Sequence, residues 1–173
     1  VVNEVRRAEQ RRLLEEGDIE AAKSLKRTRY ILTSSRSTLQ RKDAEAAEGK
    51  ILRKGNELFG TENIVRKGGV EQKYDDLLAQ NKLLFTLDLV KEKLADAYTE
   101  RDEPRMAAKI TDIIDLCEAT NCKPLRWFGR LLTNHFEGVI AHATYPISSG
   151  KVEGINQRIK TLRRQGYGYP DDE

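Results

Sequence analysis

The sequence has no long apolar run and only two cysteines, and each shortage excludes a class of protein. No stretch of roughly 18 consecutive apolar residues occurs, and no export signal is visible. Two cysteines in 173 residues are too few for a disulfide framework and suit a reducing compartment. We therefore expect a cytoplasmic protein with no membrane contact.

Local motifs of several common enzyme classes are also missing. There is no glycine-rich phosphate loop of the Walker type, and no local motif indicates a Ser/His/Asp arrangement. No segment shows the apolar and polar alternation typical of a strand, and there is no internal repeat. Because 34% of the residues are charged and only 6% are aromatic, we predict a mainly α-helical fold built from helical hairpins.

Apolar residues recur at helical spacing along most of the chain. We expect helices over residues 1–16, from an N-cap at Asp18 through Arg29, from Ser37 or Thr38 to about Leu58, over 72–100, from Pro104 past Cys117, and from Pro124 through Val139. In the last of these, Leu125, Phe128, Leu132, His135 and Val139 are expected to face inward. The glycine-containing stretch 59–69 is expected to be a loop.

The small net charge of +3 conceals an uneven distribution. Residues 21–42 hold seven bases and no acid: Lys23, Lys26, Arg27, Arg29, Arg36, Arg41 and Lys42. Residues 71–120 hold twelve acids and seven bases, which gives a net charge of −5. The basic run is either a solvated face or a surface for a polyanion, and its lack of compensating acids favours contact with a nucleic-acid backbone.

Cysteine and histidine spacing raises the alternative of a zinc site. Cys117, Cys122, His135 and His142 follow a pattern close to that of a zinc finger. The last gap is longer than usual, no strand hairpin surrounds the cysteines, and Cys117 completes an isoleucine-rich helix face. We therefore interpret the cysteines as buried thiols and the histidines as helix-face residues.

The stretch 145–169 is the most informative part of the sequence. Beyond the Ser148-Ser149-Gly150 turn, helical spacing predicts one buried apolar stripe: Val152, Ile155, Ile159 and Leu162. Between Ser148 and Gly168, Glu153 is the single acid among five bases: Lys151, Arg158, Lys160, Arg163 and Arg164. This pattern is typical either of a surface helix whose first-turn acid complements the helix dipole or of a metal-binding carboxylate among phosphate-contacting bases. Spacing does not separate the two.

The run Ile147-Ser-Ser-Gly-Lys-Val-Glu-Gly-Ile-Asn156 and the following Arg158-Ile-Lys160 and Arg163-Arg-Gln-Gly-Tyr-Gly-Tyr169 resemble a known signature. It is the C-terminal signature of bacterial insertion-sequence transposases of the ISL-three type, which are DDE transposases with an RNase-H-like catalytic fold. Ser149 stands where that family usually has Asn. The segments 5–7, 25–32 and 89–94 are similar to further family segments.

The resemblance implies a role for individual residues. Glu153 would be the third acid of the DDE triad and a ligand of Mg²⁺ or Mn²⁺, with the two catalytic aspartates upstream of residue 1. DNA contacts would come from Lys151, Asn156, Arg158, Lys160, Arg163 and Arg164. The implied partner is double-stranded DNA at the transposon ends, and the full-length protein would be a homo-oligomer.

The resemblance also implies a domain organisation. Residues 1–123 would form the helical insertion region, and residues 124–173 would form the C-terminal helices with the glutamate signature. The chain would be a fragment that is inactive alone, since the RNase-H-like sheet would lie upstream. Two alternatives remain, namely a non-catalytic helical nucleic-acid-binding module or decayed transposase, and a helical protein-interaction domain that uses the acidic middle.

Overall fold

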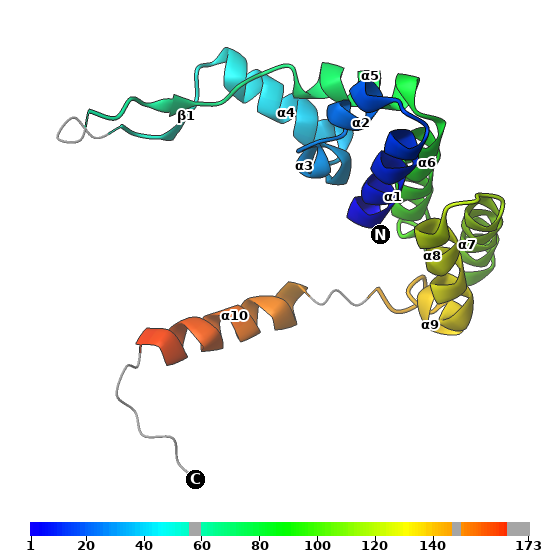
Figure 1. The fold of residues 1–173 in the computed structure, drawn as a ribbon. Coiled ribbons are helices and arrows are strands. Elements are labelled where there is room, and N and C mark those ends of the chain that lie inside the picture. The colour runs from blue at the N-terminus through cyan, green and yellow to red at the C-terminus, as the bar shows by residue number, and fades with distance from the viewer. Residues whose placement is uncertain (56–59, 147–149, 166–173) are drawn as a thin grey trace, which may run out of the picture.

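The computed structural model describes residues 1–55, 60–146 and 150–165, and they are mainly helical, as predicted (Figure 1). The helices are α1 (Val2–Glu15), α2 (Ile19–Ser24), α3 (Arg29–Thr33), α4 (Arg36–Ala47), α5 (Val70–Gln80), α6 (Lys82–Ala97), α7 (Glu103–Glu118), α8 (Lys123–Asn134), α9 (Phe136–Ile140) and α10 (Gly150–Gln165). Two short strands, β1 (Ile51–Arg53) and β2 (Ile64–Val65), form a hairpin. Within the described part of the chain, no helix is both long and apolar enough to cross a bilayer.

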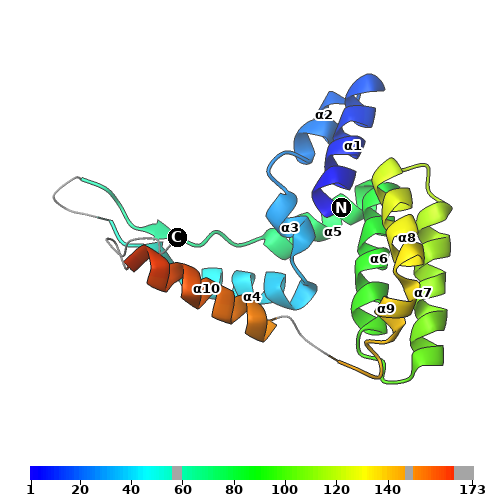
Figure 2. The same cartoon turned by 90° about the horizontal axis from the view of Figure 1, so that it is seen from below.

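The hydrophobic core extends from α1 to α8. Within it, α6, α7 and α8 stand side by side in both ribbon views (Figures 1 and 2). Of the five α7 residues at helical spacing, Ile114 is half-buried and four are buried: Met106, Ile110, Ile113 and Cys117. The helix begins as the sequence indicates, because the Asp102 side chain accepts a hydrogen bond from the Arg105 backbone N–H and Pro104 lies in the first turn. Burial of this isoleucine-rich face supplies much of the hydrophobic stabilisation of the body.

The N-terminal helix α1 packs on α2, α3, α6 and α8. Asp18 caps α2 as predicted, since its carboxylate accepts from the Ala21 N–H at 3.0 Å. The expected continuation of α2 to Arg29 is wrong, because the helix ends at Ser24 and Arg27 has a φ of 61°. This left-handed turn lets both Leu25 and α3 pack inward.

The next two expected boundaries are also wrong. Ser35 rather than Ser37 or Thr38 caps α4, and the helix stops at Ala47 instead of near Leu58. Gly49 follows in the left-handed region, with φ 67°, a conformation that favours glycine and ends the helix. The chain then forms the β1–β2 hairpin, with Ile51 opposite Val65. Strand β1 replaces the end of the helix expected to reach Leu58, and β2 lies in the expected loop over 59–69.

Two carboxylates of α4 hold the base of this hairpin. Glu45 forms ion pairs with Lys50 at 2.7 Å and with Arg66 at 3.0 Å. Asp43 accepts the backbone N–H groups of Val70 and Glu71, which begin α5. These bonds lower the pKa of the Asp43 carboxyl, because they stabilise its charged form. The hairpin itself projects away from the helices (Figure 1).

The long helix expected over 72–100 is two helices. Asn81 adopts an extended conformation, with φ −138° and ψ 105°, between α5 and α6. Its side chain accepts from the Leu84 N–H at 3.0 Å, so it caps α6, and its amide donates to the buried Glu9. Apolar residues recur at helical spacing on both sides of Asn81, so periodicity alone does not reveal the break.

The helix expected from Pro124 through Val139 is divided at His135 into α8 and α9. Leu125 and Leu132 are buried as predicted, and Phe128 and Val139 are half-buried. The prediction that His135 faces inward is wrong, since this residue at the junction of the helices is exposed.

Helix α10 forms where the sequence predicts it, but it stands apart from the helical body (Figure 1). The prediction of a buried stripe is wrong for Ile155, Ile159 and Leu162, which are 59%, 50% and 58% exposed. The Val152 side chain lies outside the described residues. The other described helices pack against one another, and the apolar stripe of α10 stays exposed.

Candidate nucleic-acid interface

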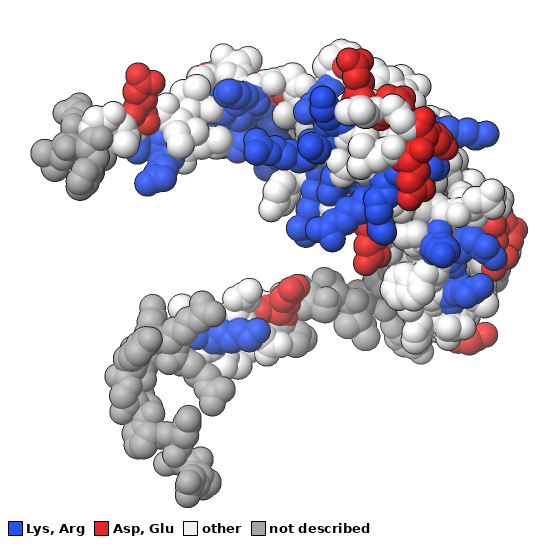
Figure 3. Space-filling view, viewed as in Figure 1, with Lys and Arg blue, Asp and Glu red and all other residues white. Residues whose placement is uncertain are grey.

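The acid-free segment 21–42 folds into α2, α3 and the first half of α4. Its apolar residues point inward, and Ala22, Leu25, Leu32 and Leu39 are all buried. Its bases remain outside, with Lys23, Lys26, Arg27, Arg29 and Arg41 exposed and Lys42 half-buried. Figure 3 shows Lys and Arg side chains gathered over α1 to α4 on the face that is turned toward α10.

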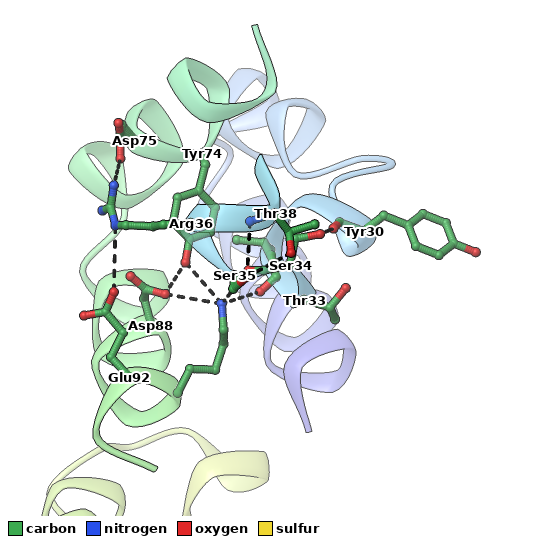
Figure 4. Close-up of polar contacts among 12 residues, drawn as sticks. Tyr30, Thr33, Ser34, Ser35, Arg36, Thr38, Tyr74, Asp75, Asp88 and Glu92 are labelled. Atoms are coloured by element: carbon green, nitrogen blue, oxygen red, sulfur yellow. Dashed lines mark hydrogen bonds and ion pairs between the residues drawn. The ribbon is translucent and has the colours of Figure 1, made fainter. Parts of the chain in front are cut away.

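A buried polar cluster fixes this segment to the rest of the body (Figure 4). The Lys91 ammonium of α6 donates to the carbonyl oxygens of Leu32 and Ser34 at 2.9 and 3.1 Å and to the Tyr74 hydroxyl at 3.2 Å. The Tyr74 hydroxyl in turn donates to the Asp88 carboxylate, which also pairs with Lys91. Burial and the neighbouring carboxylate raise the pKa of Tyr74. The junction of α3 and α4 is therefore held on α5 and α6.

Arg36 is a second anchor. Its guanidinium pairs with Asp75 at 2.8 Å and with Glu92 at 3.8 Å, and it lies 5.4 Å from the centre of the Tyr74 ring. The hydrogen bond to Asp75 raises the pKa of Arg36. The other six bases of the segment have no carboxylate in ion-pair contact among the described residues. Arg36 thus holds the segment in place, and the other six are available to an external anion.

Helix α1 extends this basic surface. Arg7 and Arg11 are exposed and have no ion pair with any described residue, whereas Arg12 is held by Glu9 and Glu16. We call the eight available bases the α1–α4 basic surface: Arg7, Arg11, Lys23, Lys26, Arg27, Arg29, Arg41 and Lys42. The sequence analysis did not identify Arg7 and Arg11, because α1 also contains acids and its net charge is therefore small. Their spacing of four residues, which places them on one helix face, is the signal that identifies them.

On α10, the described side chains of the signature are all exposed: Glu153, Asn156, Arg158 and Lys160. Glu153 lies in the first turn, three residues before Asn156 and seven before Lys160, so these three share one side of the helix. The backbones of Lys151, Arg163 and Arg164 belong to α10, but their side chains lie outside the described residues. The structure thus presents the predicted glutamate and part of its predicted basic surroundings on one isolated helix.

The described residues do not assemble a complete metal site around Glu153. No cluster of three or more His, Cys, Asp or Glu side chains suited to a metal ion occurs in the part of the chain that the structure describes. Glu153 offers a single carboxylate, which is too few ligands for Mg²⁺ or Mn²⁺ by itself. The residues described here therefore do not fit a complete divalent-metal centre.

The cysteines and histidines of the zinc-like spacing have separate surroundings. Burial raises the pKa of the Cys117 thiol to about 11. The His142 ring packs edge-on against Tyr98, with ring centres 4.9 Å apart. His135 is exposed at the start of α9. These surroundings agree with the interpretation of Cys117 as a buried thiol.

Comparison with known protein families gives one match over the whole chain. The DDE transposases of the ISL3 type, a family described as "Transposase", match residues 1–173. Because the match covers every residue, the chain belongs to the ISL3-type DDE transposase family. The resemblance inferred from residues 145–169 is thereby confirmed.

A curated relative agrees with this assignment. The chain is 27% identical over 116 residues to the transposase for insertion sequence element IS1001 of Bordetella parapertussis. The aligned part is 67% of this chain and 28% of that protein, so the chain spans well under a third of the relative. No solved structure matches the chain.

Proposed function

We propose that this chain is the part of an insertion-sequence transposase that supplies the glutamate of the DDE triad and much of the DNA-contacting surface. The complete enzyme would cleave double-stranded DNA at the transposon ends and transfer the strands. The observation that supports this proposal most strongly is the family signature on α10, where Glu153 is exposed on a basic helix. In this proposal, residues 1–123 form the helical insertion region and residues 124–173 the glutamate-bearing helices.

Glu153 would supply one carboxylate to a Mg²⁺ or Mn²⁺ site, and the other acids would come from residues outside those described here. When bound, such an ion stabilises the negative charge that develops on the phosphate oxygens during phosphoryl transfer. The chain itself contributes the position of Glu153 in the first turn of α10, with Asn156 one turn further on. The Asn156 amide would donate to a phosphate oxygen and thereby help to orient the DNA strand.

DNA would be held mainly through its phosphates. In this proposal the eight bases of the α1–α4 basic surface contact the DNA backbone. Five bases of α10 act on the same polyanion, namely Lys151, Arg158, Lys160, Arg163 and Arg164. Contacts of this kind give affinity without sequence preference, because the phosphates are the same in every sequence. We further propose that the full-length transposase acts on transposon ends as a homo-oligomer.

A second function is compatible with the lack of an acid cluster around Glu153 among the described residues. If no further acids join Glu153, the chain is a non-catalytic helical DNA-binding module or the remnant of a decayed transposase. Both functions predict binding to duplex DNA, and only the first predicts that Glu153 is required for cleavage. The two are separated by measuring binding and cleavage independently.

DNA binding is tested with the 173-residue chain and a fluorescent duplex, by anisotropy between about 50 and 200 mM salt. Affinity is expected to fall steeply as salt rises, because phosphate contacts release counterions. Replacing two bases of the basic surface, Lys26→Glu with Arg29→Glu, is expected to lower affinity at least about tenfold and to flatten the salt slope. Arg101→Glu with Arg105→Glu, in the acidic region, is the matched control. Affinity that is insensitive to salt would contradict backbone binding.

Catalysis is tested in the full-length transposase. Glu153→Gln is expected to abolish Mg²⁺-dependent cleavage and strand transfer while DNA binding stays intact or becomes slightly tighter, since one negative charge is removed near the phosphates. The isolated chain is expected to be inactive. Transposition by the Glu153→Gln protein at the parental rate would refute the role of Glu153 and leave the DNA-binding module as the better description.

A further inference from the structure

Helix α8 carries an exposed aromatic residue among bases, separate from both surfaces described above. Four exposed residues lie on one side of the helix at spacings of three, four and seven, and we call them the α8 outer face: Lys123, Arg126, Trp127 and Arg130. Trp127 is 55% exposed, although indole is a large apolar group that usually finds a partner.

The orientation of this outer face is fixed by close packing on the opposite side of α8. Leu125, Gly129 and Leu132 are buried, and α8 packs against α7. A β-carbon at Gly129 would lie 3.1 Å from the β-carbon of Cys117, so α8 approaches α7 as closely as glycine allows. The helix therefore cannot rotate to bury Trp127 without losing its own core contacts.

The charged residues of α8 are all basic. No acid occurs in the sequence from Ala119 to Phe136. None of the three bases of the outer face takes part in an ion pair among the described residues, and Figure 3 shows Lys and Arg side chains clustered over α8. The chemistry that matches this face is a flat π-system with negative charges on both sides of it. A nucleotide strand provides both.

The bases of intact duplex DNA stack on one another and leave only their edges accessible, whereas an unpaired base can stack on an aromatic side chain. A second copy of this chain fits the face less well. A two-fold interface would place the basic side chains of one α8, which have no ion-pair partner among the described residues, against those of the other. These arguments select a single strand.

We propose that the α8 outer face binds an unpaired segment of DNA, with Trp127 stacking on a base and Lys123, Arg126 and Arg130 contacting the adjacent phosphates. This inference rests on the proposed DNA-binding function and assigns to it a separate site for single strands. The site would hold strand ends that lose their pairing when DNA is opened.

The test uses Trp127 as its own reporter, since it is the single tryptophan of the chain. Titration with a short oligothymidylate is expected to quench its fluorescence, with the same midpoint as binding measured by anisotropy. Trp127→Ala is expected to weaken oligothymidylate binding about tenfold, a loss typical of one stacked base, and to leave binding of a blunt duplex within about twofold. Trp127→Phe, which keeps an aromatic ring, is expected to retain most of the affinity.

Phe85→Ala provides a matched aromatic control, because Phe85 is also 55% exposed and lies on α6, outside the α1–α4 basic surface and the α8 outer face. This variant is expected to bind the oligothymidylate like the parent. Binding of DNA with unchanged Trp127 fluorescence would overturn the α8 site and leave the proposed function standing. An equal loss for single strand and duplex in Trp127→Ala, or a loss of self-association in sedimentation, would also overturn it. Failure to bind either DNA would refute the proposed function as well.

Discussion

Helices α8 and α10 have similar amphipathic sequences and different surroundings. In α8 the apolar residues Leu125 and Leu132 are buried against the body, whereas Ile155 and Ile159 of α10 are at least half exposed. Both helices form where their periodicity predicts them. Periodicity therefore identifies a helix and its apolar face, but it does not identify the surface that covers this face.

The position along the chain explains part of the difference. The loop before α8 is short and begins at the end of α7, with Cys122 buried, so the helix returns directly onto its neighbour. Before α10 the chain leaves the core after the buried Ala143, and Tyr145 is already exposed. The body and α10 thus provide matched sites where the same substitution is expected to have unequal effects.

The largest contrast is expected for a buried charge. Ile113→Asp in α7 should destabilise the body by at least about 4 kcal/mol, because the carboxylate would lie unpaired in a fully buried position. Ile159→Asp in α10 should change the free energy of unfolding by less than about 0.5 kcal/mol. Chemical denaturation followed by circular dichroism measures both. Equal destabilisation by the two variants would show that α10 packs on the body in solution.

Two lysine substitutions, one in the helical body and one on α10, should give the next largest difference in stability. Lys91→Met removes the donor shared by two carbonyl groups, Tyr74 and Asp88, and should cost about 2 to 3 kcal/mol. Lys160→Met on exposed α10 should have almost no effect on stability while it weakens DNA binding. Thermal melts and anisotropy on the same preparations separate the two effects. A melt of the Lys91 variant that matches the parent would mean that the cluster does not anchor the basic segment.

Two helical glycines sharpen the comparison further. Gly129→Val should destabilise the body by about 2 kcal/mol, since its β-carbon would lie 3.1 Å from that of Cys117 and its two methyl groups would need further space. Gly154→Ala meets nothing within 4 Å and should instead favour helix formation locally by about 0.5 to 1 kcal/mol. The first variant should lower the melting temperature, and the second should increase helical ellipticity at an unchanged melting temperature. A destabilising effect of the Gly129 variant together with a helix-favouring effect of the Gly154 variant would support close packing at α8 and open surroundings at α10.

The smallest effect is a pH dependence from Glu9. Hydrogen bonding to Arg12 lowers the pKa of this buried carboxyl, against the opposing effect of burial. Its stabilising contribution should be complete above the unfolded value of about 4.3 and be lost as pH falls through the lower folded pKa. Glu9→Gln should therefore flatten the loss of stability below about pH 4.3. Glu153→Gln is the control, and an identical acid profile for all three proteins would exclude a contribution from Glu9.

Much of the helical body was predictable from the sequence because its signals are local. The Asp18 cap, the Asp102–Pro104 start of α7 and the spacing from Met106 to Cys117 act within a few residues of one another. The hairpin at 51–65, the break at Asn81 and the turn at Arg27 were not predictable from spacing, because side chains from distant segments contribute to them. Glu45 holds the hairpin base, and Asn81 bonds to Glu9, which lies 72 residues away in sequence.

The candidate interface was predictable to a similar extent. The acid-free run and the signature helix followed from charge and resemblance, and both are at the surface of the protein. The anchoring role of Arg36 was hidden because its partner Asp75 belongs to the acidic middle of the chain. The α8 outer face was visible in the sequence as an acid-free stretch, but exposure of Trp127 depends on which side of α8 packs against α7.

The base of the β1–β2 hairpin has a consequence for the evolution of chain length. The Arg66 N–H donates to the Lys50 carbonyl at 2.9 Å, so residues 51–65 leave the body and return at adjacent points. Since closing a longer loop between two fixed neighbours costs little additional entropy, insertions or deletions in this arm leave α4 and α5 in register. Related transposases can therefore differ in length here while they keep the same helical body.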